Sequence, residues 1–324
     1  MTILPALLQV RQLYDSDPSM FKAAGSQAAR LSGLGRTMTI AGTVVFIIVM
    51  AILLFAMWRR RNEPAVDGPP LPVNETAWVL YGGAAIPALI LAGIFFLTLG
   101  AFRSSRLPAD PALTIEVIGH QWWWEVRYPG QQVETANEIH LPVGQPVKIL
   151  LRSADVIHSF WVPNLAGKTD VIPGHENATW LEADGAGTWR GECAEYCGMQ
   201  HAHMALSVVA QPAGDFARWI RNERAAAVAP SDSGVLEGMH TFLNAQCVYC
   251  HTVRGTQATG TVGPDLTHFA SRLTIASGTL PNTRGNLGGW ILNPDRVKPG
   301  TKMPAVQLSG GELQAILAYL ETLR

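Results

Sequence analysis

The sequence predicts a membrane-anchored, multidomain protein, with a two-helix transmembrane hairpin, a β-sandwich and an all-α C-terminal domain. Two long runs without a charged side chain predict the hairpin, β-branched and aromatic runs predict the sandwich, and an apolar stripe at helical spacing predicts the last domain. Hydrophobic residues make up 48% of the 324 residues and charged residues only 15%, with a net charge of −1. This balance suits a chain that lies partly in lipid, and the lack of a basic stripe argues against a nucleic-acid partner.

The two uncharged runs cover residues 37–58 and 76–102. A helix needs roughly 20 apolar residues to cross the hydrocarbon core of a bilayer, so each run is long enough. We therefore expect residues 1–36 to form an N-terminal segment and residues 37–102 to form the hairpin. Buried helices of a soluble protein are the alternative, and two runs of this length disfavour it.

The soluble part divides at changes of composition. Residues 107–225 carry the strand-like runs and end in a short helix, and residues 226–234 are small, polar and proline-containing, as in a linker. Residues 235–324 form the predicted helical domain. There, Ser309 and Glu312 form a capping box ahead of an apolar stripe.

A C-x-x-C-H motif made by Cys247, Cys250 and His251 is typical of covalent haem attachment. Two thiols form thioether bonds to haem c, and the adjacent histidine reaches the iron. A zinc site would need a second ligand pair in this domain, and a redox dithiol gives no reason for the histidine. Met303 is the only methionine after the motif and is the predicted second axial ligand, with His268 as its competitor.

This domain resembles class I cytochromes c. The resemblance rests on Gly263-Pro264-Asp265-Leu266 after the motif, then on Trp290, Asn293-Pro294 and a closing helix. It implies that Pro264 lines the histidine face of the haem.

A second cluster consists of Cys193, Cys197, His201 and Met204, with His158 upstream. Two thiolates, two imidazoles and a thioether form a soft ligand set that suits copper better than calcium or magnesium. A disulfide between the cysteines is the alternative in an oxidising compartment. It would give no reason for the histidine and methionine that follow, and a mononuclear blue-copper site needs only one cysteine, so the pair points to two metal ions.

This arrangement resembles the dinuclear CuA centre of cytochrome c oxidase subunit II, and it implies a cupredoxin-like fold for the sandwich. In that family both thiolates bridge the two copper ions, and each copper takes one histidine. The resemblance therefore implies bridging roles for Cys193 and Cys197, and it implies that Met204 and the backbone carbonyl of Glu195 are weak outer ligands.

Three further residues receive roles from the same resemblance. The aromatic stretch at residues 119–124 matches the family and implies that Trp124 relays electrons, while Trp122 and Trp123 are expected to pack the domain. The Glu195 side chain corresponds to a ligand of a magnesium ion at the border with the catalytic subunit. Glu75 matches an acid at the mouth of a proton channel, with an ordinary interfacial carboxylate as the alternative.

The whole chain is thus similar to a subunit II with a fused cytochrome c domain, as in caa-type oxidases. The resemblance implies that electrons pass from a cytochrome c or another donor to haem c, to CuA and to subunit I, which reduces oxygen and pumps protons. Subunit III and membrane lipid are further expected partners.

The expected location is the bacterial cytoplasmic membrane. Haem c is attached outside the cytoplasm, and two spans place both termini on one side, so both termini and the soluble domains are expected on the periplasmic side. Arg59, Arg60 and Arg61 between the spans agree weakly with a cytoplasmic loop.

Three alternatives remain. The intact ligand set argues against a quinol oxidase subunit, which lacks copper ligands. A nitric oxide reductase with a similar copper subunit and a free-standing membrane-anchored electron carrier stay open.

Overall fold

The computed structural model describes all residues except 1–8, 16, 63–73, 105, 108–110 and 112. Parts of the predicted N-terminal segment and of the loop between the spans therefore lie outside the described residues. The chain divides into two units, one of residues 30–106 and one of residues 1–29 with 107–324.

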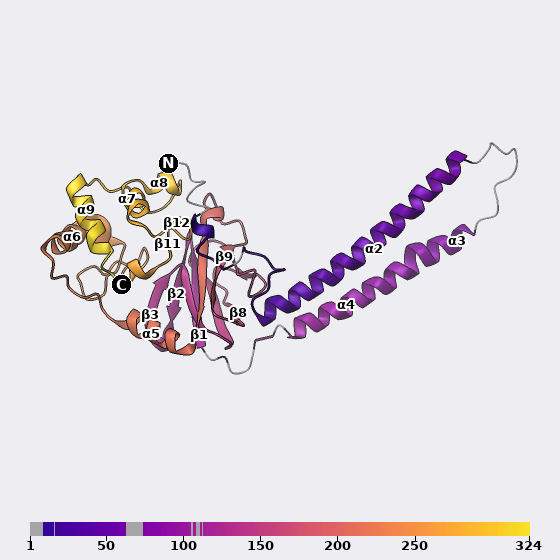
Figure 1. The fold of residues 1–324 in the computed structure, drawn as a ribbon, viewed down its shortest axis with the longest axis horizontal. Helices are drawn as coiled ribbons and strands as arrows, with labels where there is room; N and C mark the ends of the chain where they lie inside the picture. The colour runs from indigo at the N-terminus through magenta and orange to yellow at the C-terminus, as the bar shows by residue number, and fades with distance from the viewer. Residues whose placement is uncertain (1–8, 16, 63–73, 105, 108–110, 112) are drawn as a thin grey trace. The chain divides into compact units, whose positions relative to one another are not determined.

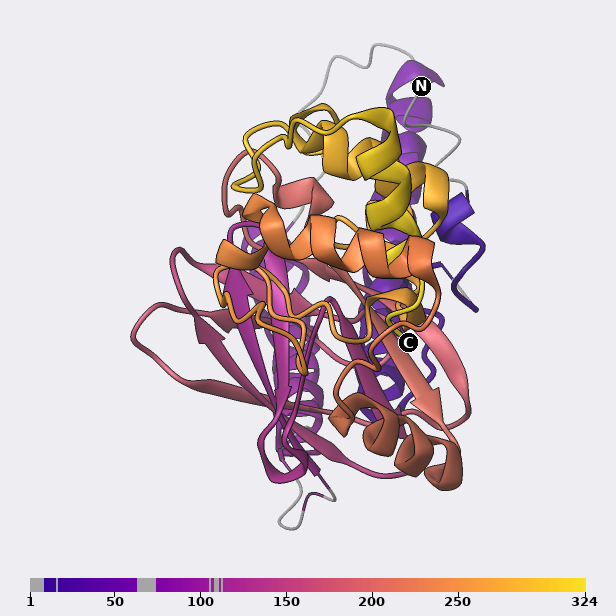
Figure 2. The same cartoon turned by 90° about the vertical axis from the view of Figure 1, so that its left-hand side faces the viewer.

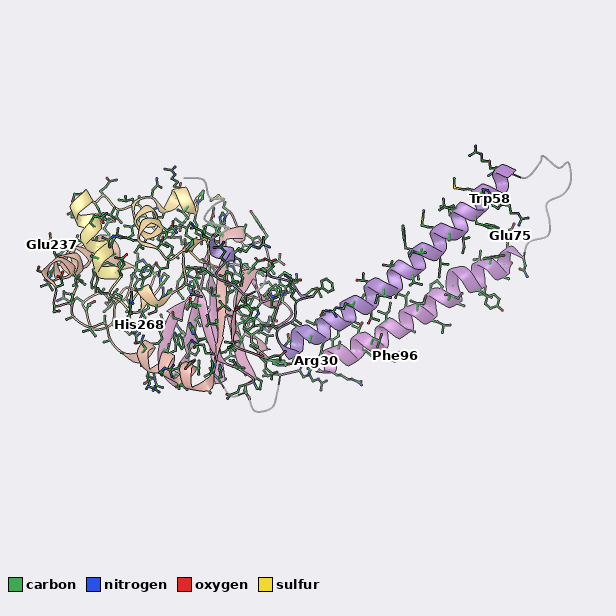
Figure 3. All side chains as sticks on the ribbon, in the orientation of Figure 1. Arg30, Trp58, Glu75, Phe96, Glu237 and His268 are labelled. Carbon is green, nitrogen blue, oxygen red and sulfur yellow. The ribbon has the colours of Figure 1, made fainter. Side chains whose placement is uncertain are left out.

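The first unit is helical. Helix α2 covers Ser26–Asn62, and the second arm consists of α3 (Glu75–Ala77), a π-helical stretch η1 (Trp78–Ala85) and α4 (Ile86–Ser104). The two arms run in opposite directions, and Trp58 and Glu75 lie at the same end (Figures 1 and 3). Both arms are long and apolar enough to cross a membrane, and their large apolar side chains are exposed.

Polar side chains inside the first predicted span are satisfied within the helix. The hydroxyl groups of Thr37, Thr39 and Thr43 donate to backbone carbonyls four residues earlier, at 3.0, 2.8 and 2.8 Å. Since lipid offers no hydrogen-bond partners, this internal bonding lets threonine stand in an apolar span. The helix also begins at Ser26, well before the predicted start of the span at residue 37.

The β domain is a sandwich of two five-stranded sheets, with strand orders β3-β2-β1-β5-β8 and β4-β10-β9-β6-β7. The first sheet contains β1 (Leu113–His120), β2 (Trp123–Tyr128), β3 (Val133–Ala136), β5 (Val147–Ser153) and β8 (Asn177–Leu181). The second contains β4 (Glu138–Pro142), β6 (His158–Trp161), β7 (Thr169–Val171), β9 (Gly187–Cys193) and β10 (Ala205–Gln211). Alternate side chains of strands such as β5 point into a shared apolar core.

The sandwich also includes residues that the sequence analysis assigned to a separate N-terminal segment. The Ala24 and Ala28 amides donate to the carbonyls of Asn164 and Leu165, at 2.7 and 3.1 Å. The Tyr14 hydroxyl lies 3.0 Å from the hydroxyl of Ser207 on β10. Residues 9–29 therefore pack on the β domain, a contact that no local pattern indicated.

The C-terminal domain is helical, as predicted. It contains α6 (Ser233–Asn244), α7 (Arg284–Leu292), α8 (Pro294–Val297) and α9 (Gly310–Leu320), with α5 (Ala213–Arg224) before it. Ser309 and Glu312 form both bonds of the predicted capping box. Helices α6 and α9 cross (Figure 2). They are in contact at Gly238 of α6, where a Cβ atom would lie 1.9 Å from the Ala315 carbonyl oxygen of α9.

A short hairpin, β11 (Thr274–Ile275) and β12 (Leu280–Pro281), joins the helical domain to the sandwich. The Ala205 amide donates to the Ser277 carbonyl at 3.0 Å, and the Ser277 hydroxyl donates to the Ala205 carbonyl at 2.9 Å. Ala276 and Ser277 have φ of 52° and 56°, the left-handed region that side chains disfavour. These bonds hold the strained turn against the sandwich.

The Gly238 crossing yields a stability prediction. Replacing Gly238 with alanine forces α6 away from α9, and we expect α9 amides to lose about 1–3 kcal/mol of protection against hydrogen exchange. Gly285 on α7 is the matched control, because a Cβ there meets nothing within 4 Å. Gly285→Ala should leave α9 protection unchanged or slightly raised, and equal losses in the two variants would contradict the packing argument.

Candidate metal centre and haem site

The two cysteines of the β domain lie at one end of the sandwich. Cys193 ends β9, and Cys197 follows in the loop that leads to η3 (His201–His203) and β10. We call residues 193–204 the copper-ligand loop. The two Sγ atoms are 3.8 Å apart and both cysteines are free, whereas a disulfide needs about 2.05 Å. The disulfide alternative therefore does not describe this structure.

The remaining predicted ligands converge on these sulfur atoms. His158 Nδ1 lies 3.9 Å from Cys193 Sγ, and His201 Nδ1 lies 3.8 Å from Cys197 Sγ. Met204 Sδ is also 3.8 Å from Cys197 Sγ. Such separations are about twice a metal–ligand bond of roughly 2.0–2.3 Å, as expected for donors that share ions. The residues present therefore fit a copper centre.

The backbone contributes one more donor. The Glu195 carbonyl oxygen lies 3.2 Å from Cys193 Sγ, on the sulfur side of the cluster. The Glu195 side chain is exposed and points to no partner that the described residues provide. The predicted carbonyl role thus has a geometric basis.

Electrostatics explains why the pair needs a cation. The hydrogen bond from Cys197, followed by bonds from His158 and backbone groups, holds the pKa of Cys193 well below its ordinary value. Cys193 in turn raises the pKa of Cys197, because a second thiolate would face the first at 3.8 Å. Two thiolates this close form together only when positive ions neutralise them.

The ligands are oriented by residues that carry no motif. Asp155 Oδ1 lies 2.9 Å from His158 Nε2, which directs Nδ1 of the ring toward the sulfur atoms. Gln121 Nε2 and Trp122 Nε1 both donate to the Cys197 carbonyl, at 2.8 and 3.0 Å. Sequence reasoning gave Asp155 and Gln121 no role, although Asp155 stands three residues before His158 and Gln121 lies within the aromatic stretch.

The three adjacent tryptophans have different surroundings. Trp124 is 0% exposed and lies in the sandwich core, with its ring 5.8 Å from the His158 ring and edge-on to Phe160. Trp122 is at the edge of that core and contacts the C-terminal domain through its carbonyl, which accepts from Lys298 Nζ at 2.7 Å. Trp123 stacks on His120 at 4.5 Å.

The predicted haem residues lie at the start of the C-terminal domain. Cys247 is in η4 (Gln246–Tyr249), and Cys250 and His251 follow directly. His251 Nδ1 donates to the Pro264 carbonyl at 2.8 Å, which leaves Nε2 as the atom for iron. Burial lowers the pKa of His251 and so favours the neutral imidazole that binds metal. Pro264 thus contacts the histidine, as expected from the resemblance.

The two candidates for the second axial position differ in their contacts. His268 is buried and labelled in Figure 3, and its Nε2 donates to the Ala225 carbonyl at 3.0 Å. Met303 is half-buried and packs on the same apolar core as Cys247. The residues present fit haem c, and because His268 Nε2 is already bonded, Met303 stays the predicted second ligand.

Residues 129–211 match the family described as "Cytochrome C oxidase subunit II, periplasmic domain", and residues 235–324 match "Cytochrome c". A cytochrome c oxidase subunit 2 from Alkalihalophilus pseudofirmus is 34% identical over 288 residues, which cover 87% of this chain and 83% of the relative. The chain belongs to the cytochrome c oxidase subunit 2 family. The subunit 2 of Bacillus subtilis is 30% identical and covers 94% of this chain and 92% of its own. A crystal structure of the periplasmic domain of subunit II from Bradyrhizobium japonicum, 32% identical, covers 37% of this chain and 97% of its own, with a TM-score of 0.36.

Family membership confirms the predicted fold class: an apolar helical pair, a cupredoxin-like sandwich and a helical cytochrome c domain. The chain is a subunit of a haem–copper oxidase whose partner is subunit I, and its two domains imply CuA copper and haem c. The two apolar helices are consistent with a membrane-anchored subunit. The roles of individual ligands, and the predicted domain boundaries, stay predictions.

The bond between Asp155 and His158 predicts the copper affinity. Asp155→Asn keeps the shape of the side chain but removes the charge that orients His158, so we expect copper affinity to fall about tenfold to a hundredfold. The measurement is a competition titration of the whole chain against a copper chelator. Asp170→Asn, at an exposed position on β7, is the control and should leave the affinity unchanged.

Proposed function

We propose that this subunit accepts electrons at its cytochrome c domain, passes them to its copper domain and delivers them to subunit I. One observation carries this proposal: the segment that leads to Met303 lies on the copper-ligand loop. Gln200 directly precedes His201 in the chain, and its Nε2 donates to the Pro299 carbonyl at 2.7 Å. The predicted haem ligand and the predicted copper ligands therefore belong to two loops in direct contact.

Each ligand then has a defined task. Cys193 and Cys197 would bridge two copper ions, His158 and His201 would bind one ion each, and Met204 with the Glu195 carbonyl would complete the set. Cys247 and Cys250 would tether the haem, and His251 with Met303 would bind its iron. Bound copper and haem supply one-electron chemistry at nearly fixed geometry.

The relay residue is better sought at Trp122 than at Trp124. Trp122 joins the two domains, because its carbonyl accepts from Lys298 and its indole donates to the Cys197 carbonyl. Trp124 contacts His158 but lies within the sandwich core. We therefore propose Trp122 as the principal relay and keep Trp124 as the competing assignment.

Other parts of the proposal concern the assembled oxidase. Its donor is a cytochrome c or another redox protein, subunit I reduces oxygen and pumps protons, and subunit III is a further partner. Both termini and the soluble domains lie on the periplasmic side. The exposed Glu195 carboxylate binds magnesium at the subunit I border, and Glu75 stands at the mouth of a proton channel.

Spectroscopy of the whole chain, after haem attachment and copper loading, tests the two centres. We expect a copper hyperfine pattern from one electron shared by two equivalent nuclei, beside a low-spin c-type haem spectrum. Met303→Leu should convert the haem to a high-spin or water-ligated form, because the thioether is lost. His268→Gln is the matched comparison and should leave the haem spectrum unchanged. A haem spectrum without the shared copper signal would contradict the copper centre, and the protein would then be a tethered cytochrome.

The relay assignment predicts different results for two matched substitutions. Trp122→Phe removes the indole donor to Cys197 and should slow copper reduction after photoreduction of the haem, with both spectra intact. Trp124→Phe should leave that rate close to wild type and lower stability instead, since Trp124 is a core residue. The reverse pattern would assign the relay to Trp124.

A further inference from the structure

A lysine is buried where the two domains meet. Lys298, from the C-terminal domain, is 3% exposed, and its Nζ donates to the Trp122 carbonyl at 2.7 Å. Lysine is almost never fully buried without a partner, because removing an ammonium ion from water is costly. Burial accordingly lowers the pKa of Lys298. Simple packing of the two domains would not require such a residue.

The neighbours of Lys298 also contact the copper domain. We call residues 298–303 the methionine loop, since it ends at Met303. A Cβ on Gly300 would lie 2.4 Å from the Met199 methyl group, and Lys302 Nζ is 3.6 Å from Asp155 Oδ2. The loop therefore contacts the copper domain at Lys298, Gly300 and Lys302, of which Lys298 alone is buried.

These contacts reach residues that support copper ligands. Trp122 is bonded to the Cys197 carbonyl, and Asp155 is bonded to His158. Gln200 precedes His201 and also pairs with His203 Nδ1 at 2.7 Å. The methionine loop thus lies on the residues that orient the ligands, not on an unrelated part of the sandwich.

We propose that Lys298 and Lys302 are positioning residues that fix the methionine loop in one register on the copper domain and thereby keep the haem docked for electron transfer. This inference rests on the proposed relay from haem c to CuA. It adds residues to that relay that touch neither the haem nor the copper and that act through Trp122 and Asp155.

The two lysines act differently. A register that kept Lys298 buried but moved it from the Trp122 carbonyl would leave its amino group without an acceptor, so this residue penalises such misaligned states. The Lys302 side chain is 64% exposed, and its ion pair with Asp155 is a weak, salt-screened contact. Lys298 should therefore contribute more than Lys302 to fixing the register of the methionine loop.

The contact of the β11–β12 hairpin with the sandwich should keep the C-terminal domain attached when the Lys298 bond is lost. Ser277 remains bonded to Ala205, and Arg190 donates to the Gly278 carbonyl at 3.0 Å. Because these bonds lie outside the methionine loop, a Lys298 variant should loosen the loop while the domain stays folded and attached.

The test uses the full-length chain with haem attached and copper loaded. Lys298→Met keeps the length and apolar stem but removes the ammonium group. After a laser flash with a soluble ruthenium photoreductant, copper reduction should show a fast phase from docked molecules and a slow phase limited by docking. We expect the ratio of fast to slow amplitude to fall about tenfold, equivalent to about 1.4 kcal/mol.

A second readout needs no copper. In the copper-free chain, amide exchange in residues 298–303 should accelerate about tenfold in Lys298→Met, while amides of α6 and α9 keep their protection. A purely structural role would instead lower protection throughout the helical domain.

Two further variants complete the design. Lys148→Met is the matched control, because Lys148 pairs with Thr114 in register, far along β1 from Trp122; it should change neither readout. Lys302→Gln, at an exposed position, should lower the amplitude ratio less than Lys298→Met and lose its effect at high salt. An unchanged ratio in Lys298→Met, or an equal fall in Lys148→Met, would overturn the proposal. Absence of either spectroscopic centre in the wild type would instead refute the proposed function.

Discussion

Two sulfur atoms 3.8 Å apart in a buried site constrain the structure around them. Only one of these thiols ionises readily by itself, so the site depends on bound cations and on donors placed before the metal arrives. The sandwich provides this placement, because β6 brings His158 and β9 brings Cys193 to the same end of one sheet. Asp155 and Trp122 then fix the histidine ring and the loop carbonyl.

The contact between the two soluble domains follows from the same site. The helical domain touches the sandwich at the methionine loop and at the β11–β12 hairpin, and both areas adjoin ligands: Ala205 follows Met204, and Gln200 precedes His201. A further bond runs from the Leu273 amide to Glu138 Oε2 on β4, at 3.0 Å. Several separate bonds define one orientation where a single bond would allow rotation.

The features that the sequence alone predicted are encoded locally. Ligands at spacings of a few residues, the C-x-x-C-H motif, the apolar runs and the capping box of Ser309 each require only a short window. The contacts of Lys298 with Trp122 and of Lys302 with Asp155 join residues that are more than a hundred positions apart, and their partners are a backbone carbonyl and an ordinary acid. No pattern in the chain marks such pairs.

The surroundings of the two tryptophans show the same limit. Period-two alternation along a strand says that neighbours face opposite sides, but it does not say which side meets another domain. Trp124 falls on the core side, and Trp122 stands in the turn between β1 and β2, where its carbonyl accepts from Lys298 of the C-terminal domain. Only the packing of distant segments separates a core tryptophan from one at an interface.

The covalent linkage explains why this interface is polar. The short segment of residues 225–232 between α5 and α6 gives the attached domain an effective concentration on the order of millimolar, so docking needs little intrinsic affinity. An apolar interface would tolerate several registers, since its attraction is non-directional. A buried lysine with a single well-placed acceptor favours a single docking register. Two tethered domains already meet often, so what remains to be specified is their orientation. A residue such as Lys298, which destabilises misaligned orientations, specifies it without making the domains bind tightly.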